Sequence, residues 1–166
     1  MEPTEVSRPR MPGYGITARD EGLLPWAWAV DQLRASRHYW VATTWPDGRP
    51  HLSPVWGVWL DDAAWFSCGG RSRKALNMSV EPRCSLTTQD PLDPVVLTGR
   101  AEVDRSPDAI GRFLDALNAK YEVAYARSFL DPDVNLSVRV QPTSVIALRS
   151  ADFTGSPTRW TFPPLP

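Results

Sequence analysis

The sequence predicts a mainly β protein, an antiparallel barrel of six to seven strands with helices packed on its outside. Segments rich in β-branched and aromatic residues recur along the 166 residues, and proline, aspartate and glycine mark the turns between them. Only three segments have the apolar spacing of an amphipathic helix. A doubly wound sheet would alternate strand and helix throughout, so the order of elements favours the barrel.

The composition indicates a single domain with a nearly neutral surface. The chain has eighteen Lys and Arg residues and nineteen Asp and Glu residues, and most of the basic residues are dispersed along the sequence. This distribution argues against a general nucleic-acid partner. No apolar run is long enough to cross a membrane and the N-terminus lacks the order of a signal peptide, so we expect a cytoplasmic protein. Because prolines gather at both ends, we expect an irregular arm over residues 1–24, the barrel domain over 25–162 and a tail over 163–166.

The first half of the domain reads as one helix and three strands. The stretch "LPWAWAVDQLRASR" (24–37) has apolar residues at helical spacing and Pro25 in the first turn. The segments "HYWVATTW" and "HLSPVWGVWL" flank "PDGRP", which predicts a β-hairpin. A turn at Asp61 and Asp62 then leads into "AAWFSC" (63–68), a third strand that ends just before Gly69 and Gly70.

The second half adds two helices and three strands. A helix is expected in "SRKALNMSV" (72–80), with Ser72 as its N-cap and Ala75, Leu76 and Val80 facing inward. The segments "RCSLTTQ", "PVVLTGRAEVD" and "LSVRVQPTSVIALR" predict strands. The strongest helix is "SPDAIGRFLDALNAKYE" (106–122), with Ser106 as its cap followed directly by a proline.

The loop "CGGRSRKALN" (68–77) predicts an anion site. Arg71, Arg73 and Lys74 lie at the start of a helix, where free N–H groups and the helix dipole already favour an anion. Cations are unfavourable there unless an anion offsets them, so we expect a phosphate to be held with the help of Ser72. The loop departs from the Walker pattern, which disfavours a nucleoside-triphosphate enzyme.

Other polar residues are assigned structural roles. Cys68 and Cys84 are expected to be buried, reduced thiols, and with His38 and His51 as the only histidines no metal site is predicted. Pro54 lacks the N–H that a strand ladder needs, which places its strand at an edge or a bulge, with neighbouring backbone groups free to bond a flat heterocycle.

These residues in this order resemble the flavin and deazaflavin oxidoreductase superfamily, the pyridoxamine 5'-phosphate oxidase-like split β-barrels. The resemblance extends over Trp26 to Phe162 and rests on "DGRPHLSPVW", "SRKALN" and the closing "TRWTF". Within the superfamily it points to the actinobacterial branch that uses coenzyme F420, with FMN as the alternative cofactor.

The resemblance implies a homodimer whose two cofactor sites lie at the subunit interface and which acts on a small molecule. It implies that Arg159 and Trp160 lie in a segment that closes the partner's pocket. The remaining cofactor-binding residues that it implies form the ring wall and the phosphate clamp: Ser53, Pro54, Val55, Trp56, Phe66, Ser67, Arg71, Ser72, Arg73, Lys74 and Asn77.

The implied reaction is a hydride transfer from reduced F420 to a conjugated small molecule. The cofactor supplies the hydride while the protein orients both rings and excludes water. Catalytic residues are not evident from the sequence, and Tyr14, Tyr39 and His51 are the candidates for a proton donor. Two alternatives stay open: an FMN-dependent oxidase or reductase, and a non-catalytic module that binds a flavin-type or haem-type ligand.

Overall fold

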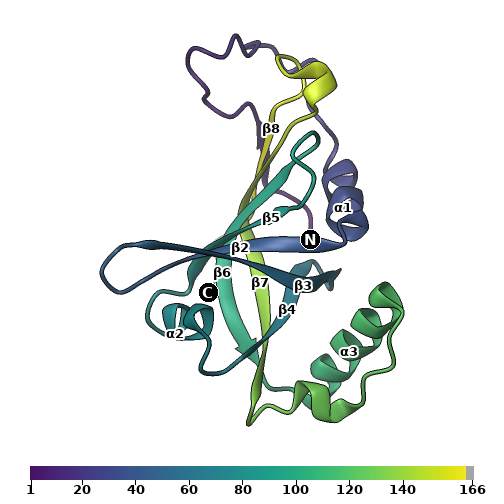
Figure 1. Cartoon of the computed structure of the whole chain (residues 1–166). Helices are drawn as coiled ribbons and strands as arrows, with labels where there is room; N and C mark the ends of the chain where they lie inside the picture. Colours follow the sequence, from purple (N-terminus) through teal and green to yellow (C-terminus); the bar gives the residue numbers. More distant parts are fainter. Residues whose placement is uncertain (164–166) are drawn as a thin grey trace.

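The computed structural model describes residues 1–163 and contains a closed antiparallel barrel (Figure 1). Its six strands follow the order β7-β4-β3-β2-β5-β6, and pairing of β6 with β7 closes the barrel. The predicted barrel of six to seven antiparallel strands is thereby confirmed. The barrel strands are β2 (His38–Thr44), β3 (Pro50–Leu60), β4 (Ala63–Gly69), β5 (Arg83–Thr88), β6 (Val95–Asp104) and β7 (Asn135–Ala147).

Two short strands extend the sheet beyond the barrel. Strand β8 (Thr158–Thr161) pairs with the second half of β7, and β1 (Glu5–Ser7) pairs with the other edge of β8. Because β1 lies within the arm expected to be irregular, that expectation is wrong for these three residues. Of the predicted tail, only Pro163 falls within the described residues.

Three helices lie on the outside of the barrel (Figure 1). They are α1 (Trp26–Ala35), α2 (Arg73–Val80) and α3 (Pro107–Tyr121), accompanied by the 3-10 turns η1 (Arg127–Leu130) and η2 (Ser150–Asp152). Ser72 and Ser106 cap α2 and α3 as predicted, each side chain accepting a backbone N–H three residues later. These caps fix where α2 begins relative to the end of β4.

The core has two parts. One fills the barrel and the other lies under α3, where Phe113, Leu114 and Leu117 pack against Val58 and Trp65. Both cysteines are buried free thiols, as predicted. Among residues 1–163, no helix combines the length and apolar character needed to cross a membrane.

The orientation of α2 differs from the expectation. Ala75 faces inward as predicted, but Leu76 and Val80 are 43% and 67% exposed. Asn77 and Met78 take the inward positions instead. The helix has only eight residues, so a small rotation about its axis decides which side chains face the barrel.

Candidate functional site

The barrel is split between β3 and β4. These strands pair only over Gly57–Leu60 and Ala63–Phe66, so the first part of β3, from Pro50 to Trp56, has β2 as its sole neighbour. Pro54 therefore lies on a strand edge, as predicted from its missing N–H. Backbone groups along this edge face away from the sheet ladder and are available to a ligand.

Strand β4 leads from this split directly into the basic start of α2. The strand ends at Gly69, Gly70 follows in the turn, and Ser72 Oγ accepts the Ala75 N–H at 3.4 Å. Arg71 is exposed, while the adjacent side chains of Arg73 and Lys74 are half-buried. These three residues, the basic triplet, form no ion pair with any carboxylate within residues 1–163. Their charges add to the positive end of α2.

Arg73 is held by the tip of the β2–β3 hairpin. Its guanidinium carbon lies 3.7 Å from the centre of the Trp45 ring, and Arg49 lies 4.5 Å from the same ring. Cation–π contacts of this kind orient a guanidinium while leaving its N–H donors free. The hairpin therefore fixes one cation of the triplet above the helix start.

A pocket of about 250 Å³ lies next to the basic triplet on the α3 side of the split. Trp56, Ser67 and Gly69 line it, together with Cys68. Burial raises the pKa of the Cys68 thiol, and the Ser72 hydroxyl and the Lys74 charge partly offset that rise. The Cys68 side chain belongs to the barrel core, whereas Gly69, which also lines the pocket, stands two residues before Arg71, so the pocket and the basic triplet are neighbours along the chain.

The residues predicted on β3 alternate between the two faces of the strand. Ser53 and Val55 point inward, while Pro54 and Trp56 are exposed on the outer face. Ser53 Oγ is buried and has no hydrogen-bond partner in the described structure. A buried hydroxyl without a partner is costly, and here it lies on the free strand edge where a ligand would satisfy it.

Three residues predicted to contact the cofactor have fully buried side chains. Phe66 fills the barrel, and Trp160 packs against Trp26 between β1 and β7 with a ring-centre distance of 5.6 Å. Asn77 donates to Thr43 Oγ1 at 3.0 Å, and Thr43 Oγ1 also contacts His51 Nδ1 at 3.3 Å. The side chain of Asn77 therefore joins α2 to the hairpin instead of facing the anion site.

The candidate proton donors lie apart. Tyr39 has no exposed surface, its hydroxyl donates to the Leu33 carbonyl, and burial raises its pKa. This burial excludes Tyr39 from contact with a substrate, so that candidate is wrong. His51 is half-buried beside Thr43, and Tyr14 is 60% exposed in the N-terminal arm, where it packs on Phe153.

The end of α3 also borders this region and was not predicted as part of the site. Tyr121 stacks on Trp56 with ring centres 4.2 Å apart, and its hydroxyl accepts the Gly57 N–H at 2.9 Å. Lys120 donates to the Gly57 carbonyl at 2.7 Å, and burial followed by the nearby Arg37 charge lowers its pKa to about 8. The only sequence signal was Tyr121 on the apolar face of the helix, and that signal is equally typical of a core residue.

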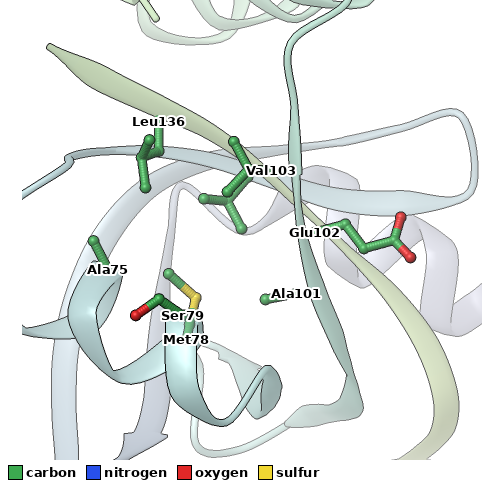
Figure 2. A pocket seen from close by; sticks show the side chains of 8 residues that line it. Ala75, Met78, Ser79, Ala101, Glu102, Val103 and Leu136 are labelled. Atoms are coloured by element: carbon green, nitrogen blue, oxygen red, sulfur yellow. The ribbon is translucent and has the colours of Figure 1, made fainter. Parts of the chain in front are cut away.

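A second, smaller pocket lies between α2 and strands β6 and β7 (Figure 2). Its volume is about 80 Å³, and the side chains of Met78, Val103 and Leu136 project into it while the Glu102 carboxylate points away. No residue of the basic triplet lines this pocket. Its lining shares no residue with the pocket lined by Trp56 and Ser67.

A closed six-stranded antiparallel barrel whose β3 and β4 pair over only part of their length is a split β-barrel. The chain belongs to the pyridoxamine 5'-phosphate oxidase family, whose profile matches residues 28–154. No curated protein matches the chain.

Solved structures with the same fold include one from Mycobacterium tuberculosis described as a conserved hypothetical protein. Its sequence is 23% identical to this one. The match covers 89% of this chain and 94% of that chain, with a TM-score of 0.67. A structure described as an F420 reductase is 24% identical over 69% of this chain and 93% of its own, with a TM-score of 0.57. A pyridoxamine 5'-phosphate oxidase-related FMN-binding protein from Nostoc punctiforme is 20% identical. The match covers 76% of this chain and 84% of that chain, with a TM-score of 0.54.

Proposed function

We propose that this protein is an oxidoreductase that binds coenzyme F420 and uses its reduced form to transfer hydride to a conjugated small molecule. The observation that carries the proposal is the contiguity of the basic triplet with the free edge of β3. One end of that arrangement suits a phosphate and the other suits the edge of a flat heterocycle.

The residues present fit such a cofactor. The uncompensated charges of Arg71, Arg73 and Lys74 suit the phosphodiester and the acidic glutamyl tail of the deazaflavin. The unpartnered hydroxyl of Ser53 and the backbone of the β3 edge supply hydrogen-bonding groups for the ring. The F420 reductase that shares this fold supports the choice of the deazaflavin over FMN.

The chain's own contribution is to bind, orient and dehydrate the reactants. When bound, the reduced deazaflavin supplies a hydride to an electrophilic carbon. The basic triplet holds the phosphate end, the β3 edge fixes the plane of the ring, and Trp56 with Tyr121 excludes water from one side. His51 lies on the same strand two residues before Ser53, and we assign it no proton-transfer role.

We propose further that two copies assemble with the cofactor sites at their interface. A row of side chains crosses five neighbouring strands on the outer face of the sheet. In the strand register each residue of this row pairs with the next, in the order Pro54, Trp40, Thr87, Val96 and Ile146. Trp40 is 41% exposed and Val96 39% exposed. An exposed apolar row of this length is typical of an interaction face, and it includes the strand edge that borders the site.

The test of the cofactor is a titration of the apo-protein with coenzyme F420 and, separately, with FMN, followed by tryptophan fluorescence. Trp56 lies at the end of the free edge of β3, so we expect saturable quenching by F420 that is lost in Trp56→Phe and kept in Trp28→Phe, a tryptophan on α1. Tighter binding of FMN would establish the alternative cofactor. No quenching by either ligand would overturn the proposal.

Two further measurements complete the test. Oxidation of reduced F420 in the presence of a panel of conjugated enones distinguishes an enzyme from a module that only binds the cofactor. Light scattering of the wild type and of Leu52→Asp tests assembly, because Leu52 is 60% exposed on the face that carries Trp40 and Pro54. A wild type that is monomeric at all concentrations would overturn the proposed dimer.

A further inference from the structure

A third pocket, of about 160 Å³, lies between the first half of α3, the turn η1 and the loop that leads into β7. It shares no lining residue with either of the pockets described above. Two arginines and four apolar residues line it: Arg105, Arg127, Pro107, Ile110, Leu130 and Pro132. The pocket therefore combines positive charge with apolar surface, and no acidic side chain belongs to its lining.

The apolar part of the lining forms a floor and a rim. Ile110 and Leu130 are buried and belong to the core beneath α3, so they make the floor. Pro107 and Pro132 are exposed and stand at the rim. A ligand with an apolar body is stabilised on such a floor, because its contact removes apolar surface from water.

The two arginines of the lining are exposed cations without a carboxylate partner. Neither forms an ion pair within residues 1–163. Arg105 donates to the Pro132 carbonyl at 3.4 Å, a long bond that uses one of its five N–H donors. The nearby carboxylates of Asp104 and Asp131 accept backbone N–H groups instead, at 2.9 and 3.0 Å. Both guanidinium groups are therefore available to an anion.

Arg127 lies against α3 at a glycine. Gly111 stands inside the helix, where glycine is unfavourable relative to alanine. A Cβ at this position would lie 3.2 Å from Arg127 Nη2, closer than an ordinary van der Waals contact. The missing side chain thus allows the guanidinium to approach the helix at the residue that follows Ile110. The charge of Arg127 is held beside the apolar floor as a result.

The turn η1, which supplies two of the lining residues, is fixed at both ends. Asn118 of α3 bonds the backbone of Tyr125 twice, accepting its N–H and donating to its carbonyl, both at 3.0 Å. Asn135 of β7 donates to the Phe129 carbonyl at 2.9 Å. The pocket is therefore formed before a ligand arrives, and binding does not have to order the turn.

The donors in the lining favour a carboxylate over a phosphate. Pro107 and Pro132 have no N–H, so the rim offers an anion the two guanidinium groups and no proline amide. A guanidinium matches the two oxygens of a carboxylate in a planar, forked geometry. A phosphate has more oxygens to satisfy and is typically held by several backbone N–H groups.

The volume and the lining set the rest of the ligand. A cavity of about 150 Å³ holds one six-membered ring, and this pocket is of similar size. None of its lining residues is aromatic, so the ligand needs no flat face.

We infer that this pocket is a binding site for small monocarboxylates with a compact aliphatic body. Arg105 and Arg127 hold the carboxylate, and Ile110 and Leu130 contact the body. The inference goes beyond the proposed function and does not depend on it, because neither the basic triplet nor the β3 edge belongs to this lining.

The test is calorimetric titration of the protein with cyclohexanecarboxylate. The matched control ligand is cyclohexanecarboxamide, which has the same ring and nearly the same shape but no charge. At low salt we expect the carboxylate to bind about fivefold more tightly than the amide, and we expect this ratio to shrink at 1 M salt. Equal affinities for the two ligands would overturn the inference, as would tighter binding of inorganic phosphate than of the carboxylate.

Substitution of the two arginines tests their role. Arg105→Gln and Arg127→Gln are each expected to weaken carboxylate binding about threefold or more and to leave binding of the amide unchanged. Both side chains are exposed, so neither substitution should impair folding. Arg112→Gln is the matched control, because Arg112 is an exposed arginine of α3 that pairs with Asp61 at 3.1 Å and lies outside the lining. Carboxylate affinity that survives both substitutions, or that falls equally in the control, would overturn the inference.

The backbone amide signal of Gly111 in a proton–nitrogen NMR spectrum locates the bound ligand, because Arg127 lies against this residue. Saturation with cyclohexanecarboxylate should shift the Gly111 signal and leave that of Gly69, which lines the pocket with Trp56, in place. A shift at Gly69 without one at Gly111 would put the ligand in that other pocket and refute the site at η1.

Discussion

Replacing Lys74 by glutamine is expected to weaken F420 binding about tenfold. Lys74 is half-buried in the first turn of α2 and forms no ion pair within residues 1–163, so its charge is available to a phosphate. A hydrogen bond to a charged group contributes roughly 1.5–3 kcal/mol, and solvent contact favours the lower end of that range. About 1.4 kcal/mol corresponds to a factor of ten in Kd.

The assay is the fluorescence titration with F420 at low salt and again at 1 M salt. Because the Debye length falls to about 3 Å at 1 M, the difference between Lys74→Gln and the wild type should shrink there. Arg112→Gln is the control, since Arg112 is exposed on α3 and pairs with Asp61 at 3.1 Å. A folded Lys74→Gln protein with wild-type affinity at low salt would refute the placement of the phosphate at α2.

Three further outcomes follow from the structure. Ser72→Ala removes the cap bond to the Ala75 N–H and should lower the free energy of unfolding by about 1 kcal/mol in urea denaturation; an unchanged value would contradict the cap. Gly57→Ala would bring Cβ to 2.6 Å from the Trp65 carbonyl oxygen, so thermal unfolding should show a loss of about 1–3 kcal/mol or more. Lys120 has a pKa of about 8 in the folded protein, against 10.5 for a free lysine side chain. Between pH 8 and pH 10.5 the unfolded state therefore binds more protons than the folded state. The contribution of Lys120 to the free energy of unfolding accordingly rises with pH over that range. A pH series of urea denaturation should show this rise in the wild type relative to Lys120→Met, and identical profiles would refute it.

The sequence predicted those features that depend on local chemistry. Pro54 marked a strand edge because proline cannot donate to a ladder, and Ser72 and Ser106 marked helix starts because their side chains satisfy free N–H groups. Each of these signals acts over a few residues. The basic triplet and the β3 edge were therefore placed correctly without knowledge of the pairing.

Features set by long-range pairing escaped the sequence analysis. The three residues of β1 become a strand only because β8, more than 150 positions later, offers an edge. Trp160 lies on a four-residue strand whose alternation fits either face, and pairing on both sides turned its ring into the core. Asn77 was assigned to the phosphate clamp from the resemblance alone, and its bond to Thr43 depends on the packing of α2 against the hairpin.

The bond from Asn77 to Thr43, together with the contact from Thr43 to His51, ties α2, β2 and β3 into one rigid unit. The helix that carries the basic triplet and the strand proposed to border the cofactor ring are therefore joined by side-chain bonds before any ligand arrives. Binding then requires little loss of conformational entropy from the protein, because α2 and β3 do not have to be brought together. Under the proposed function, the affinity of the site is accordingly set by how well the length of the cofactor, from phosphate to ring, matches the separation of α2 from the β3 edge.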